Sequence, residues 1–211
     1  MLDYDTLAVF LALNVGAYLI VHLPYIYKSL RRTSEEPGNK SLRDSYSTIK
    51  GTIITSIIVL TTLYFFVIFL IWPFYQLLIG SEFFQRWVFP FPYSNTFQLI
   101  GIGSVIVATA VNNLGRIARG GSYISDGIPV ELSKDLGHKL VRHPLYASYC
   151  YYFVGFQFIF QSYLTLPLLL GIIGYYSAAK KEEELLEEEF GEEYREYQKK
   201  VGMFLPFLGK R

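Results

Sequence analysis

Three long apolar stretches dominate the pattern of hydrophobic and polar positions along the chain, and they cover residues 7–27, 51–72 and 96–114. Each stretch is close to the ~20 residues that an α-helix needs to cross roughly 30 Å of hydrocarbon. The pattern therefore predicts three membrane-spanning helices.

Two further apolar stretches, residues 145–160 and 163–179, are shorter and are separated only by Gln161 and Ser162. This arrangement predicts a tight helical hairpin inside the bilayer, in which either arm can end before it has crossed the membrane. From Lys180 onwards, apolar residues recur every three or four positions, which predicts an amphipathic helix that continues from the hairpin.

Lysine and arginine residues are distributed unevenly among the connecting segments. Apart from one arginine, they all lie in residues 28–50, 116–142 and 180–211. By the positive-inside rule these three segments are cytoplasmic, and the N-terminus and an aromatic-rich loop, residues 73–95, are outside. Asp3 and Asp5 stand where a cleaved signal peptide has basic residues, so we expect the first stretch to remain as a helix.

Composition agrees with this arrangement, because 52% of the 211 residues are hydrophobic. We expect an all-α integral membrane helical bundle with about five membrane helices and a C-terminal amphipathic cytoplasmic helix. The net charge of +1 does not indicate nucleic-acid binding. Three histidines and a single cysteine, Cys150, offer no metal-ligand spacing and no intramolecular disulfide.

Charged and aromatic side chains gather at the predicted cytoplasmic end of the last membrane helices. They are Arg116, Arg119, His138, Arg142, His143, Tyr146, Glu182 and Glu183. Charges beside a membrane are costly to desolvate unless they bind a ligand or one another. A ligand that carries both signs, such as S-adenosylmethionine with its amino-acid head and ribose, fits this set of donors and acceptors.

The spacing of these residues resembles that of the isoprenylcysteine carboxyl methyltransferase family, which is related to phospholipid methyltransferases. The resemblance covers residues 114–210 and rests on two motifs in a fixed order. The first motif is Arg142-His143-Pro144-x-Tyr146, and the second is Glu182-Glu183-x-x-Leu186-x-x-x-Phe190-Gly191-Glu192-Glu193-Tyr194-x-x-Tyr197.

The resemblance implies a multi-span membrane enzyme that binds S-adenosylmethionine on the cytoplasmic side. Its implied acceptor is lipophilic or prenylated, foremost the carboxyl group of an isoprenylcysteine. Catalytic roles are implied for Arg142, His143 and Glu183, and cofactor binding is implied for His138, Arg142, His143, Tyr146, Glu182 and Glu183. One membrane domain, 1–211, then consists of N-terminal membrane helices and loops in 1–95 and a catalytic region that binds S-adenosylmethionine in 96–211.

Alternatives remain open at this point. Lys200 and Gly202 stand where isoprenylcysteine enzymes commonly have Arg and Pro, so a phospholipid or a thiol is a second class of acceptor. A membrane reductase that uses NADPH has a similar Arg-His-Pro-x-Tyr turn but other charges at residues 180–183. A transporter is expected to carry its polar residues near the middle of the bilayer. Gly101 and Gly103 fit either a cofactor loop of phospholipid methyltransferases or close helix packing.

Overall fold

The structure of the chain, a computed structural model, describes residues 2–32, 49–80, 84–89, 92–119, 137–206 and 208. It is an all-α membrane bundle, as the sequence predicts. Its described elements are, in chain order, α1 (Tyr4–Arg32), α3 (Ile49–Phe66), η1 (Val67–Ile71), α4 (Trp72–Ile79), η2 (Gln85–Trp87), α5 (Ser94–Arg119), α6 (Gly137–Leu140), α7 (Pro144–Phe160), η3 (Tyr163–Leu169) and α8 (Leu170–Lys200).

Three helical stretches in the described residues are long and apolar enough to cross a membrane, namely Tyr4–Tyr27, Lys50–Ile79 and Ser94–Ala118. They confirm the three spans predicted from the hydrophobic pattern. The second span is longer than predicted, because the π-helical turn η1 leads directly into α4. Pro73 lies in the first turn of α4, where a missing N–H is tolerated, so the helix continues to Ile79. The prediction that the outer loop begins at residue 73 was therefore wrong.

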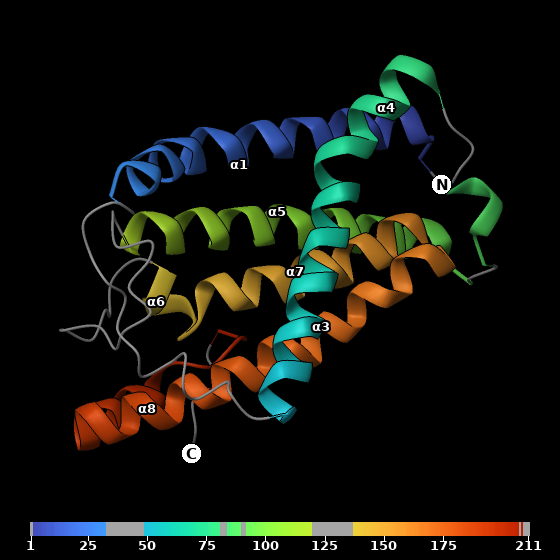
Figure 1. The fold of residues 1–211 in the computed structure, drawn as a ribbon. Coiled ribbons are helices and arrows are strands. Elements are labelled where there is room, and N and C mark those ends of the chain that lie inside the picture. The colour runs from blue at the N-terminus through green and yellow to red at the C-terminus, as the bar shows by residue number, and fades with distance from the viewer. Residues whose placement is uncertain are drawn as a thin grey trace.

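Helices α1, α5 and α7 run side by side, and α3 with α4 crosses them steeply (Figure 1). Helices α5 and α7 pack closely, since a Cβ atom on Gly101 would lie 2.7 Å from the carbonyl oxygen of Gly155. Gly101 therefore serves close helix packing, the structural alternative considered for it.

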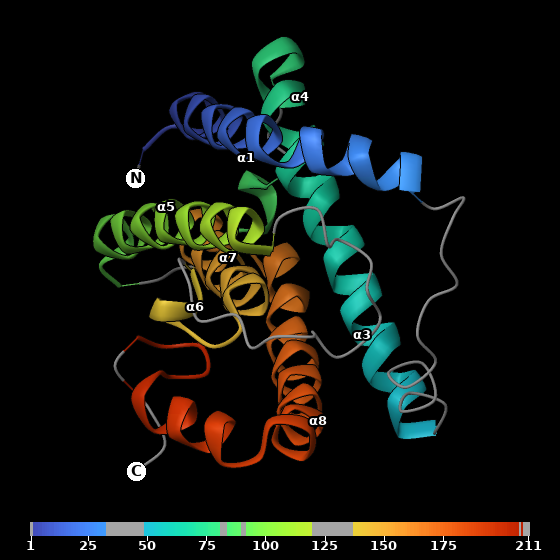
Figure 2. The ribbon, with the colours of Figure 1, turned by 90° about the vertical axis from the view of Figure 1, so that its left-hand side faces the viewer.

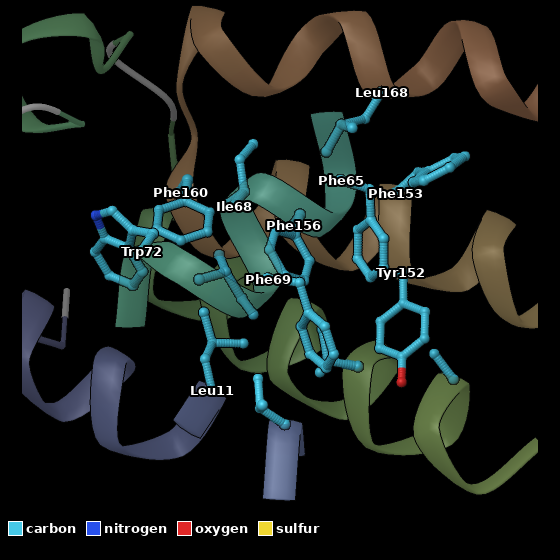
Figure 3. Packing of buried hydrophobic residues seen from close by; sticks show 14 of the residues in the cluster. Leu11, Phe65, Ile68, Phe69, Trp72, Tyr152, Phe153, Phe156, Phe160 and Leu168 are labelled. Atoms are coloured by element: carbon cyan, nitrogen blue, oxygen red, sulfur yellow. The ribbon is translucent and has the colours of Figure 1, made fainter. Parts of the chain in front are cut away.

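Aromatic rings fill the centre of the bundle (Figure 3). Phe65 and Phe69 stack with their ring centroids 5.1 Å apart, and Trp72 meets Phe160 of α7 edge-on at 4.8 Å. Rings of this size each remove a large apolar area from contact with lipid or water and prefer these stacked and edge-on geometries. The core holds α7 against the continuous helical segment formed by α3, η1 and α4, and so positions the residues that precede α7.

The predicted hairpin turn is present between α7 and η3. Gln161 adopts a left-handed conformation with φ 46° at the end of α7, and the Ser162 side chain accepts a hydrogen bond from the Leu164 amide. The second arm begins as the 3-10 helix η3 and becomes α-helical from Leu170 onwards.

Helix α8 differs from the single straight helix that the apolar spacing predicts. At Gly191 the backbone has φ 53° and ψ −123°, which lies outside the helical region and is accessible mainly to glycine. The chain turns there, and its last helical turns fold back beside α6 (Figure 2). Leu186, Tyr194 and Tyr197 consequently pack against one another in a small buried cluster.

Candidate active site

The segment Arg142-His143 is held where α6 meets α7. Pro144 begins α7, and the His143 carbonyl accepts a hydrogen bond from the Ala147 amide at 2.9 Å. Pro is favoured at this position because its fixed φ suits a first helical turn. Gly115 of α5 lies directly beneath, since a Cβ there would come within 2.9 Å of the Pro144 side chain. The turn is thus pressed onto α5.

The C-terminal segment that follows α8 lies alongside this turn. Val141 and Gly202 form a parallel bridge, and the Arg142 amide donates to the Gly202 carbonyl at 2.8 Å. The His143 amide donates to the Met203 carbonyl at 3.3 Å. A Cβ on Gly202 would lie only 1.9 Å from the Leu205 carbonyl oxygen. This turn therefore requires glycine at position 202.

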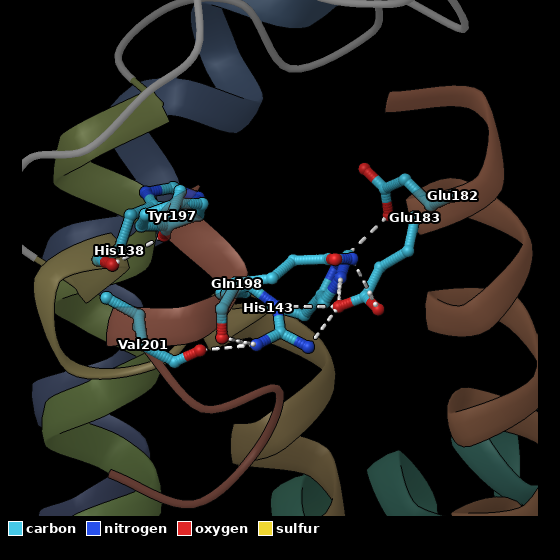
Figure 4. A network of polar contacts seen from close by, with 8 residues as sticks. His138, His143, Glu182, Glu183, Tyr197, Gln198 and Val201 are labelled. Atoms are coloured by element: carbon cyan, nitrogen blue, oxygen red, sulfur yellow. Dashed lines mark hydrogen bonds and ion pairs between the residues drawn. The ribbon is translucent and has the colours of Figure 1, made fainter. Parts of the chain in front are cut away.

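Arg142 and Glu183 form a buried ion pair. The Glu183 side chain lies beside His143 and Gln198 at the centre of the site (Figure 4). The Arg142 Nε and Nη2 atoms both lie 2.6 Å from Glu183 Oε1. The Nη1 atom donates to the carbonyl of Gln198 at 3.2 Å and to the carbonyl of Val201. The other carboxylate oxygen of Glu183, Oε2, accepts a hydrogen bond from the side-chain nitrogen Nε2 of Gln198 at 3.2 Å. The planar guanidinium thereby joins three segments at once.

His143 lies between the two glutamates. Its Nδ1 atom is 3.4 Å from Glu182 Oε2, and its Nε2 atom is 3.4 Å from Glu183 Oε1. Burial by itself lowers the pKa of His143, but hydrogen bonding and charge attraction from Glu182 and Glu183 outweigh it. The pKa of His143 is therefore raised above its ordinary value, so that the imidazole keeps its proton to higher pH than a solvated histidine.

The pKa of Glu183 shifts in the opposite direction. Burial raises it, but contacts with His143 and Arg142 exceed that effect and lower the pKa below its ordinary value. Glu183 is thus ionised at neutral pH. Glu182 differs from it in exposure, since the Glu182 side chain is 24% exposed and that of Glu183 only 4%. Of the two acids, Glu182 is the one that a ligand from outside can reach.

Of the sequence-predicted site residues, the structure brings together Arg142, His143, Glu182, Glu183 and Tyr146. The Tyr146 ring is nearly parallel to that of His143, with the centroids 5.7 Å apart. His138 joins this group through its main chain, because its carbonyl accepts a hydrogen bond from the Tyr197 hydroxyl at 2.6 Å.

Other residues considered for the same site lie in different surroundings. The Arg116 guanidinium lies over the Tyr25 ring, 5.3 Å from its centroid. Asn112, one turn before Arg116 on the same helix, donates to the Ser148 hydroxyl at 2.6 Å and so links α5 to α7. The side chain of Arg119 lies outside the described part of the chain.

Sequence reasoning missed Gln198 and the backbone carbonyl of Val201 as members of the site. It treated Tyr194 and Tyr197 only as part of a motif and an apolar face. Gly191, at which the helix is interrupted before these tyrosines, can be seen in the sequence. The local sequence does not indicate the direction that the chain takes after it. Only the fold shows that the last turns of α8 return to Arg142.

Comparison with known proteins adds a partial match, and no family model matches the chain. The chain is similar to methanethiol S-methyltransferase of Pseudomonas deceptionensis, with 40% identity over 78 residues. The match covers 34% of this chain and 27% of that relative, well under two thirds of the relative's length. Together with the three apolar spans, it supports a membrane methyltransferase.

Proposed function

We propose that this chain is an integral membrane methyltransferase that uses S-adenosylmethionine as its methyl donor. The proposal is carried by one observation: His143 contacts both Glu182 and Glu183 in a single network. The two glutamates follow His143 by 39 and 40 residues in the sequence, so the fold brings them together. The partial match to a methyltransferase supports the same class of reaction.

The donor set fits the cofactor. The partly exposed Glu182 carboxylate suits an ammonium group or ribose hydroxyls, and the aromatic ring of Tyr146, beside His143, is of the type that attracts a sulfonium cation. When bound, S-adenosylmethionine supplies an electrophilic methyl group on a positively charged sulfur. The protein's task in such a transfer is to align donor and acceptor and to exclude water.

The Arg142–Glu183 pair is assigned a positioning role within this proposal. The two side chains are anchored within the protein, because they contact each other, Gln198, the Val201 carbonyl and His143. A buried ion pair with satisfied hydrogen bonds holds its surroundings in a single arrangement. We propose that this pair fixes His143 and Glu182 at the cofactor.

For the acceptor, the sequence resemblance predicts the carboxyl group of an isoprenylcysteine. A carboxylate is already ionised at neutral pH, so its methylation requires no base. The acceptor approaches from the bilayer, and the site faces the cytoplasm as the distribution of Lys and Arg predicts.

A thiol acceptor is the second candidate, and two observations favour it. The similar protein is named for methylation of a thiol, methanethiol. In its neutral form His143 is a candidate base for the thiol proton, because Glu182 and Glu183 beside it would stabilise the imidazolium that results. In that reaction the S–H proton would pass to the imidazole, and the thiol sulfur would form a bond to the methyl carbon as the bond between that carbon and the sulfonium sulfur breaks, with S-adenosylhomocysteine as the leaving group.

The test is a methyl-transfer assay with labelled S-adenosylmethionine and purified protein in lipid nanodiscs. The acceptors are N-acetyl-farnesylcysteine, a small alkyl thiol and phosphatidylethanolamine. Label transferred to the first compound supports the carboxylate proposal, and label transferred to the second supports the thiol. No transfer to any of them, with NADPH-dependent reduction of a sterol instead, would overturn the proposed function.

A further inference from the structure

Tyr194 is a buried polar residue that the proposed site does not yet use. It lies three residues beyond the break at Gly191, and its side chain is among the largest that are fully buried, with 1% relative exposure. Its hydroxyl has no hydrogen-bond partner among the residues that the structure describes. A buried hydroxyl without a partner costs about 1–3 kcal/mol, so this one calls for an explanation.

Neighbouring Tyr197 provides the contrast. The two rings are 6.0 Å apart on the same short stretch of helix, and both are almost completely buried. The Tyr197 hydroxyl donates to the His138 carbonyl at 2.6 Å. Packing and internal hydrogen bonding thus account for the whole Tyr197 side chain, but for Tyr194 they account only for the ring.

Tyr194 lies one helical turn before Gln198, whose side chain donates to Glu183 and whose carbonyl accepts from Arg142. Tyr194 is therefore on the helix face that meets the candidate active site. Burial raises the pKa of Tyr194, and the charges of Glu183 and Glu182 raise it further, against a smaller opposing effect from Arg142. The hydroxyl therefore stays protonated at neutral pH and remains a hydrogen-bond donor.

We propose that Tyr194 is a cofactor-binding residue whose hydroxyl donates to the nucleoside half of S-adenosylmethionine. The inference rests on the function proposed above. Glu183, which accepts a hydrogen bond from the Gln198 side chain one helical turn beyond Tyr194, and the adjacent Glu182 repel the carboxylate of the cofactor's amino-acid half. A neutral acceptor, a ring nitrogen of adenine or a ribose oxygen, meets no such repulsion.

The experiment compares the wild type with Tyr194→Phe, which removes the hydroxyl alone. Affinities are measured by calorimetry for S-adenosylhomocysteine and for methylthioadenosine, which lacks the amino-acid half. We expect Tyr194→Phe to weaken both ligands about ten-fold, the loss of one buried hydrogen bond. Its melting temperature without ligand should equal or exceed that of the wild type, because an unpartnered hydroxyl has been removed.

Tyr197→Phe is the matched control, since it removes a hydroxyl that is bonded within the protein. It should lower the melting temperature without ligand, the opposite of the change in Tyr194→Phe. Unchanged affinity of Tyr194→Phe for both ligands would overturn the inference. So would a loss confined to S-adenosylhomocysteine, which would place the contact in the amino-acid half. If the wild type itself binds neither ligand, the proposed function fails first.

Discussion

Arg142 and Glu183, which are 41 residues apart in the chain, meet through two guanidinium nitrogens that both lie 2.6 Å from one carboxylate oxygen. Both residues are at least 95% buried. The guanidinium also binds the carbonyls of Gln198 and Val201, so the pair joins the start of α7 to α8 and to the segment after α8. The account of the site depends on this connection.

Glu183→Gln should remove the charge that balances Arg142. Leaving a buried guanidinium without its counter-ion is expected to reduce the free energy of unfolding by on the order of 3 kcal/mol. Binding of S-adenosylhomocysteine should weaken as well, because His143 loses a neighbour. Glu188→Gln is the control, since Glu188 is exposed on the same helix. Equal affinities of the two variants in calorimetry would refute the site assignment.

Arg142→Lys should fail to replace arginine although it keeps the positive charge. An ammonium group lacks the planar fork that reaches Glu183 and two carbonyls together. We expect a lower melting temperature and at least ten-fold weaker binding of S-adenosylhomocysteine, both measured in detergent. Arg195→Lys, at an exposed pair with Glu192, should change neither quantity. Wild-type melting temperature and affinity in Arg142→Lys would show that the planar guanidinium is not required.

Gly191→Ala tests the turn that returns the end of α8 to the site. A side chain at φ 53° and ψ −123° is strained, with an expected cost of about 1–3 kcal/mol. The variant should bind S-adenosylhomocysteine less tightly, because Gln198 moves away from Glu183. Gly103→Ala is the matched control, since a Cβ there meets nothing within 4 Å. Stability of Gly103→Ala should be unchanged or slightly higher. Wild-type affinity in Gly191→Ala would argue against the turn.

The pH dependence of stability should show two limbs with opposite causes. The raised pKa of His143 stabilises the folded state fully below its ordinary value of 6.5, and this contribution is lost as the pH rises through the folded-state pKa. The lowered pKa of Glu183 stabilises the folded state fully at pH values above the ordinary glutamate pKa of 4.5, and this contribution is lost as the pH falls through the folded-state pKa. Both contributions are complete between those two values.

Melting temperatures across a pH series, for the wild type and for His143→Gln, measure these limbs. Subtracting one curve from the other should leave a difference that shrinks as the pH rises above 6.5. A difference that instead grows with pH would mean that His143 is stabilised in its neutral form.

A structural feature of this chain could be predicted from the sequence when local interactions determine it, and not when tertiary contacts do. The apolar stretches predicted the three spans and the hairpin turn at Gln161, because hydrophobic length and local turn chemistry are sequence-local properties. The second span continues past Pro73 through the π-helical turn η1, in which Ile68 and Phe69 are buried. The pattern of hydrophobic and polar residues does not indicate such a turn.

The candidate site shows the same division. Residue types and spacing placed His143 beside Glu182 and Glu183 as a hypothesis, and the structure finds them within 3.4 Å. The involvement of Gln198 depends on where the chain travels after Gly191, which is set by tertiary contacts. An apolar face at helical spacing predicted a straight helix because periodicity does not register a single residue with positive φ.

The measurement that tests the central claim most directly is calorimetric titration of the purified wild-type protein with S-adenosylhomocysteine and, separately, with NADPH. The account predicts saturable binding of S-adenosylhomocysteine at micromolar concentration and no heat of binding with NADPH. Binding of NADPH with no response to S-adenosylhomocysteine would contradict it and would favour a reductase.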